Sequence, residues 1–384
     1  MQWIPTIKRW VALGMAASAF LTNIEAQETG FDATIPVLDM KEYLQPETKD
    51  KFVQELYQAL SEVGFFAVVN TGVDPQILDA GYQACFDFFR LSQEQKMRVN
   101  DPQLCGQRGY VPGECAKGAA SGDFKEFYHV GRTRDSEELK ALGILPNIWP
   151  ENFDLQNPLC ALHSVLEEHS VLLERAIAEA IGVRNDLFTE MTRDGDLLLR
   201  AIHYPANPPQ GRLWASEHTD IDLLTILPCA TADGLQVLNK QGEWIDVRVP
   251  PNAFIVNGGD MLENITNGEF RSGLHRVVAK DGNYERYSIV FFIHPRSPDR
   301  LDPLPECIAR TGGVRRYANA NRLELLQERL VDLGLASFPM MQDLAASGLM
   351  ERLIEVGRAS PKAMKKLMEV GLASEAILEE LKQQ

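Results

Sequence analysis

Two histidines and one aspartate carry the chemistry that this sequence indicates most directly. A single residue separates His218 from Asp220, so a β-strand would place both side chains on one face, about 7 Å apart along the backbone. His275 follows after several apolar runs separated by turn residues, so another strand of a barrel can return it to the first two. Two neutral imidazoles and one carboxylate on one face of iron(II) leave the opposite positions open for reactants. The spacing therefore predicts an open non-haem iron site.

Arg286 and Ser288 form a second group with readable chemistry. The run 286–293 favours a half-buried strand, whose alternation would put both side chains on one face. A guanidinium inside an apolar barrel needs an anion, because an unpaired buried charge is costly. Its planar fork can bind a carboxylate through two hydrogen bonds, and a hydroxyl can add a third. The alternative, a surface ion pair worth less than about 1 kcal/mol, fits this apolar run less well.

Apolar runs and turn residues outline the elements that must position these side chains. We expect a strand at 35–39, helices at 48–63, 75–91 and 159–181, a strand at 64–70, a long loop at 100–135 and barrel strands at 197–294. Short strands with frequent turns are typical of a jelly-roll, in which two antiparallel sheets enclose a mouth. The predicted fold class is mainly β with flanking helices (α+β): a double-stranded β-helix (jelly-roll) barrel with an N-terminal α/β region and a C-terminal helical tail.

The tail, 315–384, contains three similar segments in which a glycine is followed by a short Ala-Ser sequence. We expect helices to end at Gly334, Gly357 and Gly371, where left-handed backbone costs little. Ser360 can cap the next helix with Pro361 at its first position, and Ser374 can cap the last helix. This pattern predicts a small helical bundle packed against the barrel, with a lid or a self-association surface as the functional alternatives.

The segment 200–295 resembles a known family through a set of short motifs. These are Tyr204-Pro205, His218-Thr219-Asp220, Gly234-Leu235-Gln236-Val237, Asn257-Gly258-Gly259-Asp260, Ser272-Gly273-Leu274-His275-Arg276-Val277 and Arg286-Tyr287-Ser288. Together they are similar to the iron(II)- and 2-oxoglutarate-dependent dioxygenases of the isopenicillin-N-synthase-like family. With weaker N-terminal matches the resemblance covers about residues 33 to 300.

This resemblance implies that His218, Asp220 and His275 ligate iron(II). It also implies that Arg286 and Ser288 bind the distal carboxylate of 2-oxoglutarate, with Tyr204 near the same pocket, and that no further catalytic residue is required. The implied reaction uses O2 to oxidise a small organic substrate by hydroxylation, desaturation or cyclisation, and releases succinate and CO2.

Two positions depart from the family pattern. Plant members often have Asn-Tyr-Tyr-Pro where this chain has Ile202-His203-Tyr204-Pro205, so one pocket contact is expected to be lost or replaced by His203. Asp222 stands where glycine or serine is common, and it is either a hydrogen-bond partner of a metal ligand or a turn residue.

Three other readings compete with the dioxygenase. An iron(II) oxidase of the isopenicillin-N-synthase type would use Arg286 and Ser288 for its substrate's own carboxylate and would not need 2-oxoglutarate. A zinc hydrolase on the same three ligands would need a nearby acid or base to activate water, and it would have no use for Arg286. A non-catalytic barrel whose helical tail binds a partner is the least consistent with intact metal ligands.

The ends of the chain suggest a division into parts. Residues 1–26 resemble a signal peptide, because Lys8 and Arg9 precede about a dozen apolar residues. We expect an N-terminal dioxygenase region at 33–135, a catalytic domain at 136–310 with its core at 199–296, and the helical extension at 315–384. The supply of iron(II) and 2-oxoglutarate favours the cytoplasm, whereas the N-terminal pattern favours export.

Composition narrows the class of partner. The net charge of −16 argues against a nucleic-acid backbone, whose binding depends on clustered lysine and arginine. The apolar N-terminal stretch is too short for a comfortable membrane span, so no integral membrane domain is expected.

The six cysteines show no Cys-x-x-Cys spacing, and Cys105 and Cys115 are read as ordinary thiols that could pair only in an oxidising compartment. The expected partner is a small-molecule substrate, and self-association through the C-terminal helices is the alternative role of the tail.

Overall fold

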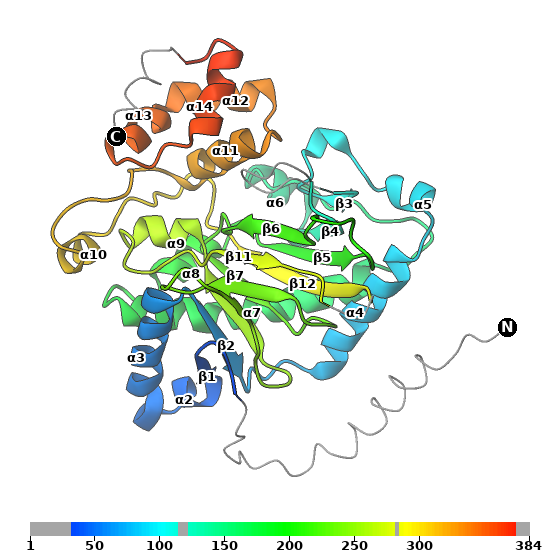
Figure 1. The fold of residues 1–384 in the computed structure, drawn as a ribbon, viewed down its shortest axis with the longest axis horizontal. Coiled ribbons are helices and arrows are strands. Elements are labelled where there is room, and N and C mark those ends of the chain that lie inside the picture. Colours follow the sequence, from blue (N-terminus) through cyan, green and yellow to red (C-terminus); the bar gives the residue numbers. More distant parts are fainter. Residues whose placement is uncertain (1–31, 114–121, 281–283, 374–384) are drawn as a thin grey trace. The chain divides into compact units, whose positions relative to one another are not determined.

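Two β-sheets face each other and enclose the site in the computed structural model, which describes residues 32–113, 122–280 and 284–373. The larger sheet has the order β1 (Val37–Asp39), β2 (Phe65–Val69), β10 (Phe254–Gly258), β7 (Leu224–Leu227), β12 (Arg286–Ile293), β5 (Leu198–Tyr204), β4 (Glu126–Val130) and β3 (Gly109–Val111). The smaller has the order β6 (Ala215–His218), β11 (His275–Val277), β8 (Leu235–Leu238) and β9 (Trp244–Asp246). Among the described strands only the β1–β2 pair is parallel. The predicted jelly-roll is confirmed (Figure 1).

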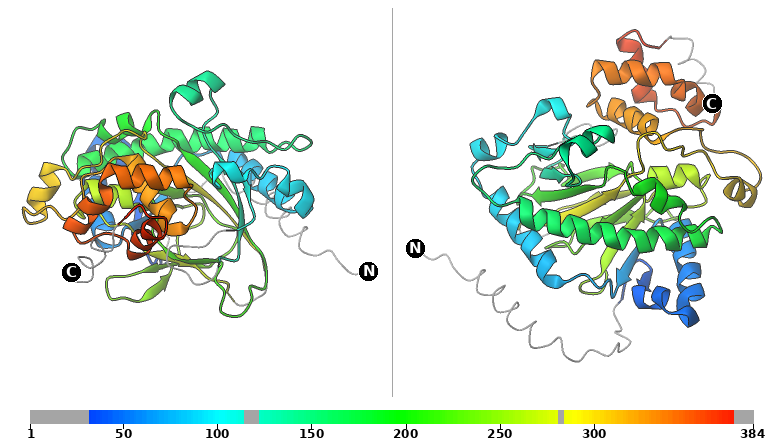
Figure 2. Two further views of the ribbon diagram at one scale, coloured as in Figure 1. Left: turned by 90° about the horizontal axis from the view of Figure 1, so that it is seen from above. Right: turned by 180° about the vertical axis from the view of Figure 1, so that it is seen from behind.

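Helices cover the outer face of the larger sheet. The longest described helix, α7 (Gln156–Ala180), runs along that face, as the rear view shows (Figure 2), and contacts β4, β5 and β12. Its predicted apolar stripe is buried, with Leu162 and Leu166 both fully enclosed. The other helices before the tail are α2 (Met40–Leu44), α3 (Pro46–Glu62), α4 (Pro75–Phe89), α5 (Gln93–Met97), η1 (Pro102–Leu104), α6 (Ser136–Ala141), α8 (Leu187–Thr192), α9 (Asp260–Ile265) and α10 (Pro305–Arg310).

The prediction of an uninterrupted loop at 100–135 is wrong at two places. Strand β4 pairs with β5 along its whole length, and β3 extends the sheet by pairing with β4. Both strands contain residues that favour strands, such as Phe127, Tyr128 and Val130, but each is short and lies among glycines and aspartates. Pairing of β4 with β5, and of β3 with β4, stabilises them in the sheet. The larger sheet thus takes strands from both sides of residue 135, and the division into regions at 135 and 310 stays a prediction.

The C-terminal tail forms four described helices that lie together at one end of the barrel (Figure 1). They are α11 (Arg322–Leu333), α12 (Phe338–Ser347), α13 (Leu349–Glu355) and α14 (Pro361–Glu369). Gly334 ends α11 in the left-handed conformation, and Gly357 and Gly371 also have positive φ angles, as predicted. Ser360 caps α14 with Pro361 at its first position, which confirms that prediction too.

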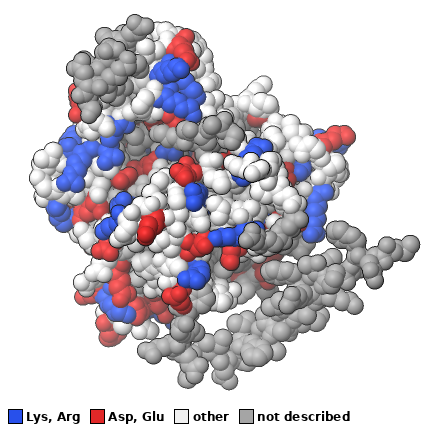
Figure 3. Space-filling view, in the orientation of Figure 1, with Lys and Arg blue, Asp and Glu red and all other residues white. Residues whose placement is uncertain are grey.

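Some expectations fall on residues that the structure does not describe, namely the signal-like segment 1–26, Cys115 and Ser374. The described residues from 33 to 373 form one compact unit. None of its described helices is long and apolar enough to cross a membrane. On the face drawn in Figure 3, basic and acidic side chains are interspersed.

A buried ion pair ties α5 to β4. The Lys96 ammonium lies 2.6 Å from the Glu126 carboxylate, and both side chains are at most about one-eighth exposed. Burial raises the pKa of Glu126, but hydrogen bonds from His203, Lys96 and Tyr110 outweigh it and lower the pKa to about 2. A folded-state pKa below the unfolded one stabilises the fold above pH about 4.5, and this contribution disappears as the pH falls through about 2.

We therefore expect Glu126→Gln to lower the free energy of unfolding by about 3 kcal/mol at neutral pH. The difference from the wild type should shrink as the pH falls from about 4.5 towards 2, which urea titrations at several pH values would measure. Glu285→Gln is a matched control, because Glu285 bonds the same His203 but its side chain is 46% exposed. A loss that does not depend on pH would contradict this assignment.

Candidate functional site

The structure brings His218, Asp220 and His275 together at one end of the smaller sheet. His218 ends β6 and His275 begins β11, and the antiparallel register places these two residues directly opposite each other. The Oδ1 atom of Asp220 lies 3.9 Å from the Nε2 atom of each histidine. One ligand atom from each of the three residues lies within 4.8 Å of the others. Three donors this close can bind a single metal ion.

Backbone carbonyls set the tautomers of both histidines. Nδ1 of His218 lies 2.7 Å from the carbonyl oxygen of Ser216, and Nδ1 of His275 lies 3.0 Å from that of Gly273. A carbonyl oxygen only accepts, so each Nδ1 carries the proton and each Nε2 keeps its lone pair for a metal. Burial and then the neighbouring His275 lower the pKa of His218 to about 3, which keeps that imidazole neutral.

Close packing fixes the ring of His275. The edge of Phe65 meets it with ring centroids 5.4 Å apart. Gly273 leaves the space for Phe65, because a Cβ atom at this position would overlap the phenyl ring. The glycine that supplies the orienting carbonyl therefore also admits the aromatic ring that holds His275 in place.

Two side chains bind the outer oxygen of Asp220. Its Oδ2 atom accepts hydrogen bonds from Thr225 Oγ1 at 2.7 Å and from Asn257 Nδ2 at 3.0 Å, which leaves Oδ1 on the side of the histidines. Burial raises the pKa of Asp220, but the two histidines and these hydrogen bonds outweigh it and lower the pKa to about 2. Asp220 is therefore ionised and can serve as a negatively charged metal donor.

Asp222 continues this hydrogen-bonded chain. Its Oδ2 lies 2.9 Å from the same Thr225 hydroxyl, which has one proton to donate. Burial and then the charge of Asp220 raise the pKa of Asp222 well above its usual value. The Thr225 hydroxyl lies between the two carboxyl groups, within hydrogen-bonding distance of both. Asp222 thus reaches the ligand candidate Asp220 only through Thr225, and it lies in the bend at 221–223 between β6 and β7.

The larger sheet supplies the second group of predicted residues. Arg286 lies opposite Tyr204 in the β12–β5 register, with its guanidinium carbon 5.0 Å from the centroid of the Tyr204 ring. Arg286, Ser288 and Tyr204 line the same narrow cavity as His218, Asp220 and His275. Arg286 is 3% exposed and donates from Nε to the carbonyl of Ala232, but its buried Nη1 has no hydrogen-bond partner among the described residues. This buried cation fits an anion bound beside the metal donors.

Of the two outcomes expected at His203, loss of a pocket contact or its replacement by His203, the replacement does not occur. Residues alternate along β5, so Ile202 and Tyr204 face the cavity while His203 faces the other side of the sheet. His203 stacks on Tyr287 with ring centroids 4.7 Å apart and contacts Glu126 and Glu285.

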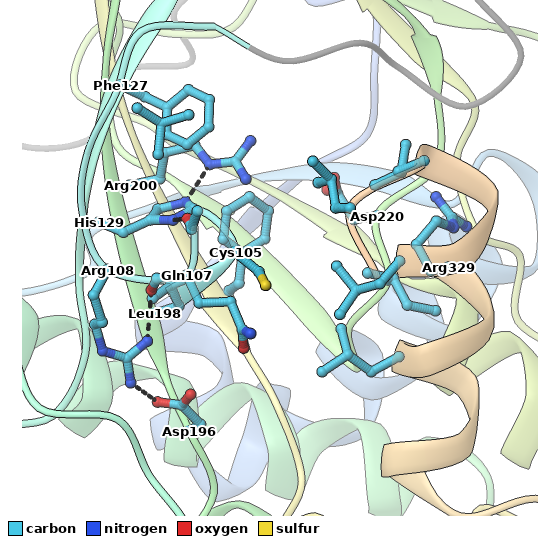
Figure 4. Close-up of a pocket in the computed structure, with 18 of the residues that line it drawn as sticks. Cys105, Gln107, Arg108, Phe127, His129, Asp196, Leu198, Arg200, Asp220 and Arg329 are labelled. Atoms are coloured by element: carbon cyan, nitrogen blue, oxygen red, sulfur yellow. Dashed lines mark hydrogen bonds and ion pairs between the residues drawn. The ribbon is translucent and has the colours of Figure 1, made fainter. Parts of the chain in front are cut away.

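A larger cavity of about 450 Å³ opens next to the metal donors (Figure 4). Its walls are the segment 100–113, strands β4 and β5, and the tail helix α11, while His218 and Asp220 lie at its inner side. Charged side chains of this cavity to which sequence reasoning gave no site role are Asp101, Arg108, Asp123, Lys125, Asp196, Arg200, Arg322 and Arg329. Asp123 and Lys125 belong to a short stretch that resembles the family, whereas the other six belong to no motif with a fixed spacing, and tertiary packing brings them together.

Arg329 connects the tail to the metal donors. Its guanidinium donates to the carbonyl oxygen of Thr219, between His218 and Asp220, at 3.0 Å and also pairs with Asp260. The backbone N–H of Asp260 in turn donates to the carbonyl of Asp220 at 2.8 Å. The first tail helix is thus bonded directly to the segment that carries two of the three donors.

Comparison with known families gives two matches along the chain. Residues 35–152 match the family described as non-haem dioxygenase in morphine synthesis N-terminal, and residues 195–295 match the 2OG-Fe(II) oxygenase superfamily. The second match contains all six predicted site residues.

Individual proteins resemble most of the chain. Homoarginine-6-hydroxylase 2-ODD-233 of Oryza sativa subsp. japonica is 32% identical over 75% of this chain and 90% of its own length. The 2-oxoglutarate-dependent dioxygenase traH of Penicillium crustosum is 29% identical over 68% of this chain and 85% of its own length. A Neurospora crassa protein, solved in complex with alpha-KG and thymine, superposes with a TM-score of 0.68 and 27% identity over 79% of this chain and 98% of that protein.

The hydroxyl of Thr225 should control how tightly the three donors hold iron(II). Thr225→Val keeps the shape of the side chain but removes the donor to Asp220, so we expect iron(II) affinity to fall by about 10- to 100-fold. Anaerobic titration with iron(II) would measure the change. Thr225→Ser, which keeps the hydroxyl, should bind iron nearly as the wild type does, and equal weakening in both variants would contradict the role of this hydrogen bond.

Proposed function

Because the chain belongs to the 2OG-Fe(II) oxygenase superfamily, we propose that His218, Asp220 and His275 ligate its iron. The protein is a 2-oxoglutarate- and Fe(II)-dependent dioxygenase that oxidises a small molecule. We further propose that Arg286 and Ser288 bind the distal carboxylate of 2-oxoglutarate, with Tyr204 beside them.

One observation carries this assignment. A buried guanidinium, whose Nη1 has no partner among the described residues, and three convergent metal donors line one narrow cavity, although they come from different parts of the fold. An unpaired buried charge is costly, so the cavity is complementary to an acidic ligand that would reach a bound metal. 2-Oxoglutarate has a carboxylate at each end, and the site offers metal donors for one end and an arginine for the other.

Each side chain has a defined task in this proposal. Nε2 of His218, Nε2 of His275 and Oδ1 of Asp220 hold the metal, and Arg286 fixes the far end of the cosubstrate. Apolar residues of the same cavity, Ile202, Leu227 and Val290, exclude water. Bound iron supplies the activation of O2 that couples decarboxylation of 2-oxoglutarate to oxidation of the substrate. The protein orients the reactants, and no separate acid or base is needed.

The substrate is proposed to bind in the larger cavity, between the metal donors and α11. This position gives the C-terminal extension a role as a wall of the pocket, to which Leu326 and Leu330 contribute apolar contacts. Self-association through the tail stays a prediction, supported by the exposed side chains of Phe338 and Val370, and light scattering on the full chain tests it.

The rivals are less well supported. An oxidase that does not use 2-oxoglutarate agrees poorly with JOX2, a protein solved with 2OG and Fe, which superposes with a TM-score of 0.64 and 27% identity over 82% of this chain and 91% of that protein. A zinc hydrolase would leave the buried Arg286 without a purpose. A non-catalytic barrel is disfavoured by the hydrogen bonds that orient all three donors.

The central test is anaerobic titration. Iron(II) followed by 2-oxoglutarate should produce the visible charge-transfer band of the chelate in the wild type. The band should be absent when His218→Ala and His275→Ala are combined. Arg286→Ala should weaken 2-oxoglutarate binding by about 30-fold or more while iron affinity is largely kept, because it removes a charge-assisted contact but no metal ligand. A band that survives the double substitution would refute the iron site.

The link from the tail to the metal donors gives another test. Arg329→Met should lower iron(II) affinity several-fold, because the carbonyl of Thr219 and the carboxylate of Asp260 lose their donor. Arg352→Met is the matched control, since it breaks an ion pair with Glu324 inside the tail, at 2.7 Å. Both variants should lose stability in thermal unfolding, and only Arg329→Met should change iron titration. Equal iron affinity in both would show that the tail does not position the donors.

A further inference from the structure

A second buried arginine lines the larger cavity without an acidic partner. Arg322 is 6% exposed, and its one hydrogen bond, from Nη1 to Ser297 Oγ, is long at 3.4 Å. Its buried Nε has no partner among the described residues. By contrast, the buried guanidiniums of Arg108 and Arg132 each have a carboxylate, at 2.5 and 2.8 Å.

A histidine beside Arg322 is also unsatisfied. His294 follows β12, is 8% exposed and lines the same cavity, and its buried Nδ1 has no hydrogen-bond partner in the described part of the chain. Burial and then the charge of Arg322 lower the pKa of His294, so the imidazole is neutral and offers one N–H donor. Buried polar groups in native proteins normally have partners, so two such groups that line one cavity and lie close enough for the charge of Arg322 to act on His294 indicate a ligand.

The surrounding charges favour an anion with a single charge. The acid that acts on Arg322 among the described residues is Asp196, and it is bound to Arg108, so Arg322 has no carboxylate of its own. The amides at the start of α11 do not contribute, because Asn321 and Glu324 form a capping box there. One guanidinium and one neutral N–H donor match a carboxylate better than a phosphate, which carries up to two charges.

We propose that the substrate is a small organic acid whose carboxylate binds to Arg322 and His294. This inference rests on the proposed function, because it places the carbon to be oxidised towards His218 and Asp220, which line the same cavity. The apolar residues Leu198, Phe292 and Leu330 also line this cavity and can contact the hydrocarbon part of the acid. A cavity of about 450 Å³ has the size of typical small-molecule sites.

Matched acids and amides test this assignment. Phenylacetate and hexanoate are compared with phenylacetamide and hexanamide, which keep the shape but remove the charge. Binding to the full-length protein loaded with iron(II) and 2-oxoglutarate is measured without oxygen, by calorimetry and by the change in the visible band. We expect at least one acid to bind about 30-fold or more tightly than its amide.

Substitutions locate the effect. Arg322→Gln should abolish the preference for acid over amide, Arg322→Lys should keep part of it, and His294→Phe should weaken acid binding several-fold. Arg315→Gln, an exposed arginine of the same tail, should behave as the wild type. Thermal unfolding with and without 2-oxoglutarate shows that each variant is folded and still binds its cosubstrate.

The outcomes separate the two proposals. The inference is overturned if, in both pairs, the acid and its amide bind equally well or neither binds. It is also overturned if Arg322→Gln still binds the acid more tightly than the amide. Tighter binding of phenyl phosphate than of phenylacetate overturns the choice of a carboxylate. If the visible band fails to form before any acid is added, the proposed iron and 2-oxoglutarate site is refuted instead.

Discussion

The antiparallel pairing of β6 with β11 is the interaction on which the site depends. It places His275 directly opposite His218, and Asp220 follows two residues after His218. Ser216 lies in β6, and Gly273 lies two residues before the start of β11. The carbonyl oxygens of these two residues fix the tautomers of His218 and His275. A shift in this register by one residue would turn one histidine to the other face of the sheet and remove it from the site.

The two sheets have different tasks, and the cavity between them requires both. The smaller sheet presents neutral and negative donors for a cation, whereas the larger sheet presents Arg286 and Ser288 for an anion. Strand β11 of the smaller sheet is only three residues long. An apolar cluster that includes Trp214 and Tyr204 packs between the two sheets and sets the distance between them. A bound metal and an acidic cosubstrate would therefore bridge two layers that are otherwise held by apolar packing.

The sequence was sufficient for the parts of the site that have local spacing. His218 and Asp220, or Arg286 and Ser288, need only the alternation of a strand to share a face, and the apolar runs around them indicated strands. Other contacts could not be predicted from local spacing, because tertiary folding brings their partners together. Examples are the hydrogen bond from Thr225 to Asp220 and the hydrogen bond from Arg329 to Thr219. Strand β4 was missed for the same reason, because its conformation depends on pairing with β5. For His203 the alternation along β5 decides between the two outcomes left open by the family pattern, because it turns this side chain away from the cavity.

Unpaired buried charge is concentrated at the reaction site. Arg108, Arg132 and Arg329 each have a carboxylate within hydrogen-bonding distance, whereas Arg286 and Arg322 have none among the described residues. Such a charge costs stability in the ligand-free protein, and an anion that binds to it relieves that cost. A chain with net charge −16 repels anions at long range, so the local cations must act at short distance, inside the cavity. The two arginines line cavities that share His218 and Asp220, so each can hold one acid against the metal donors without competing for the same anion.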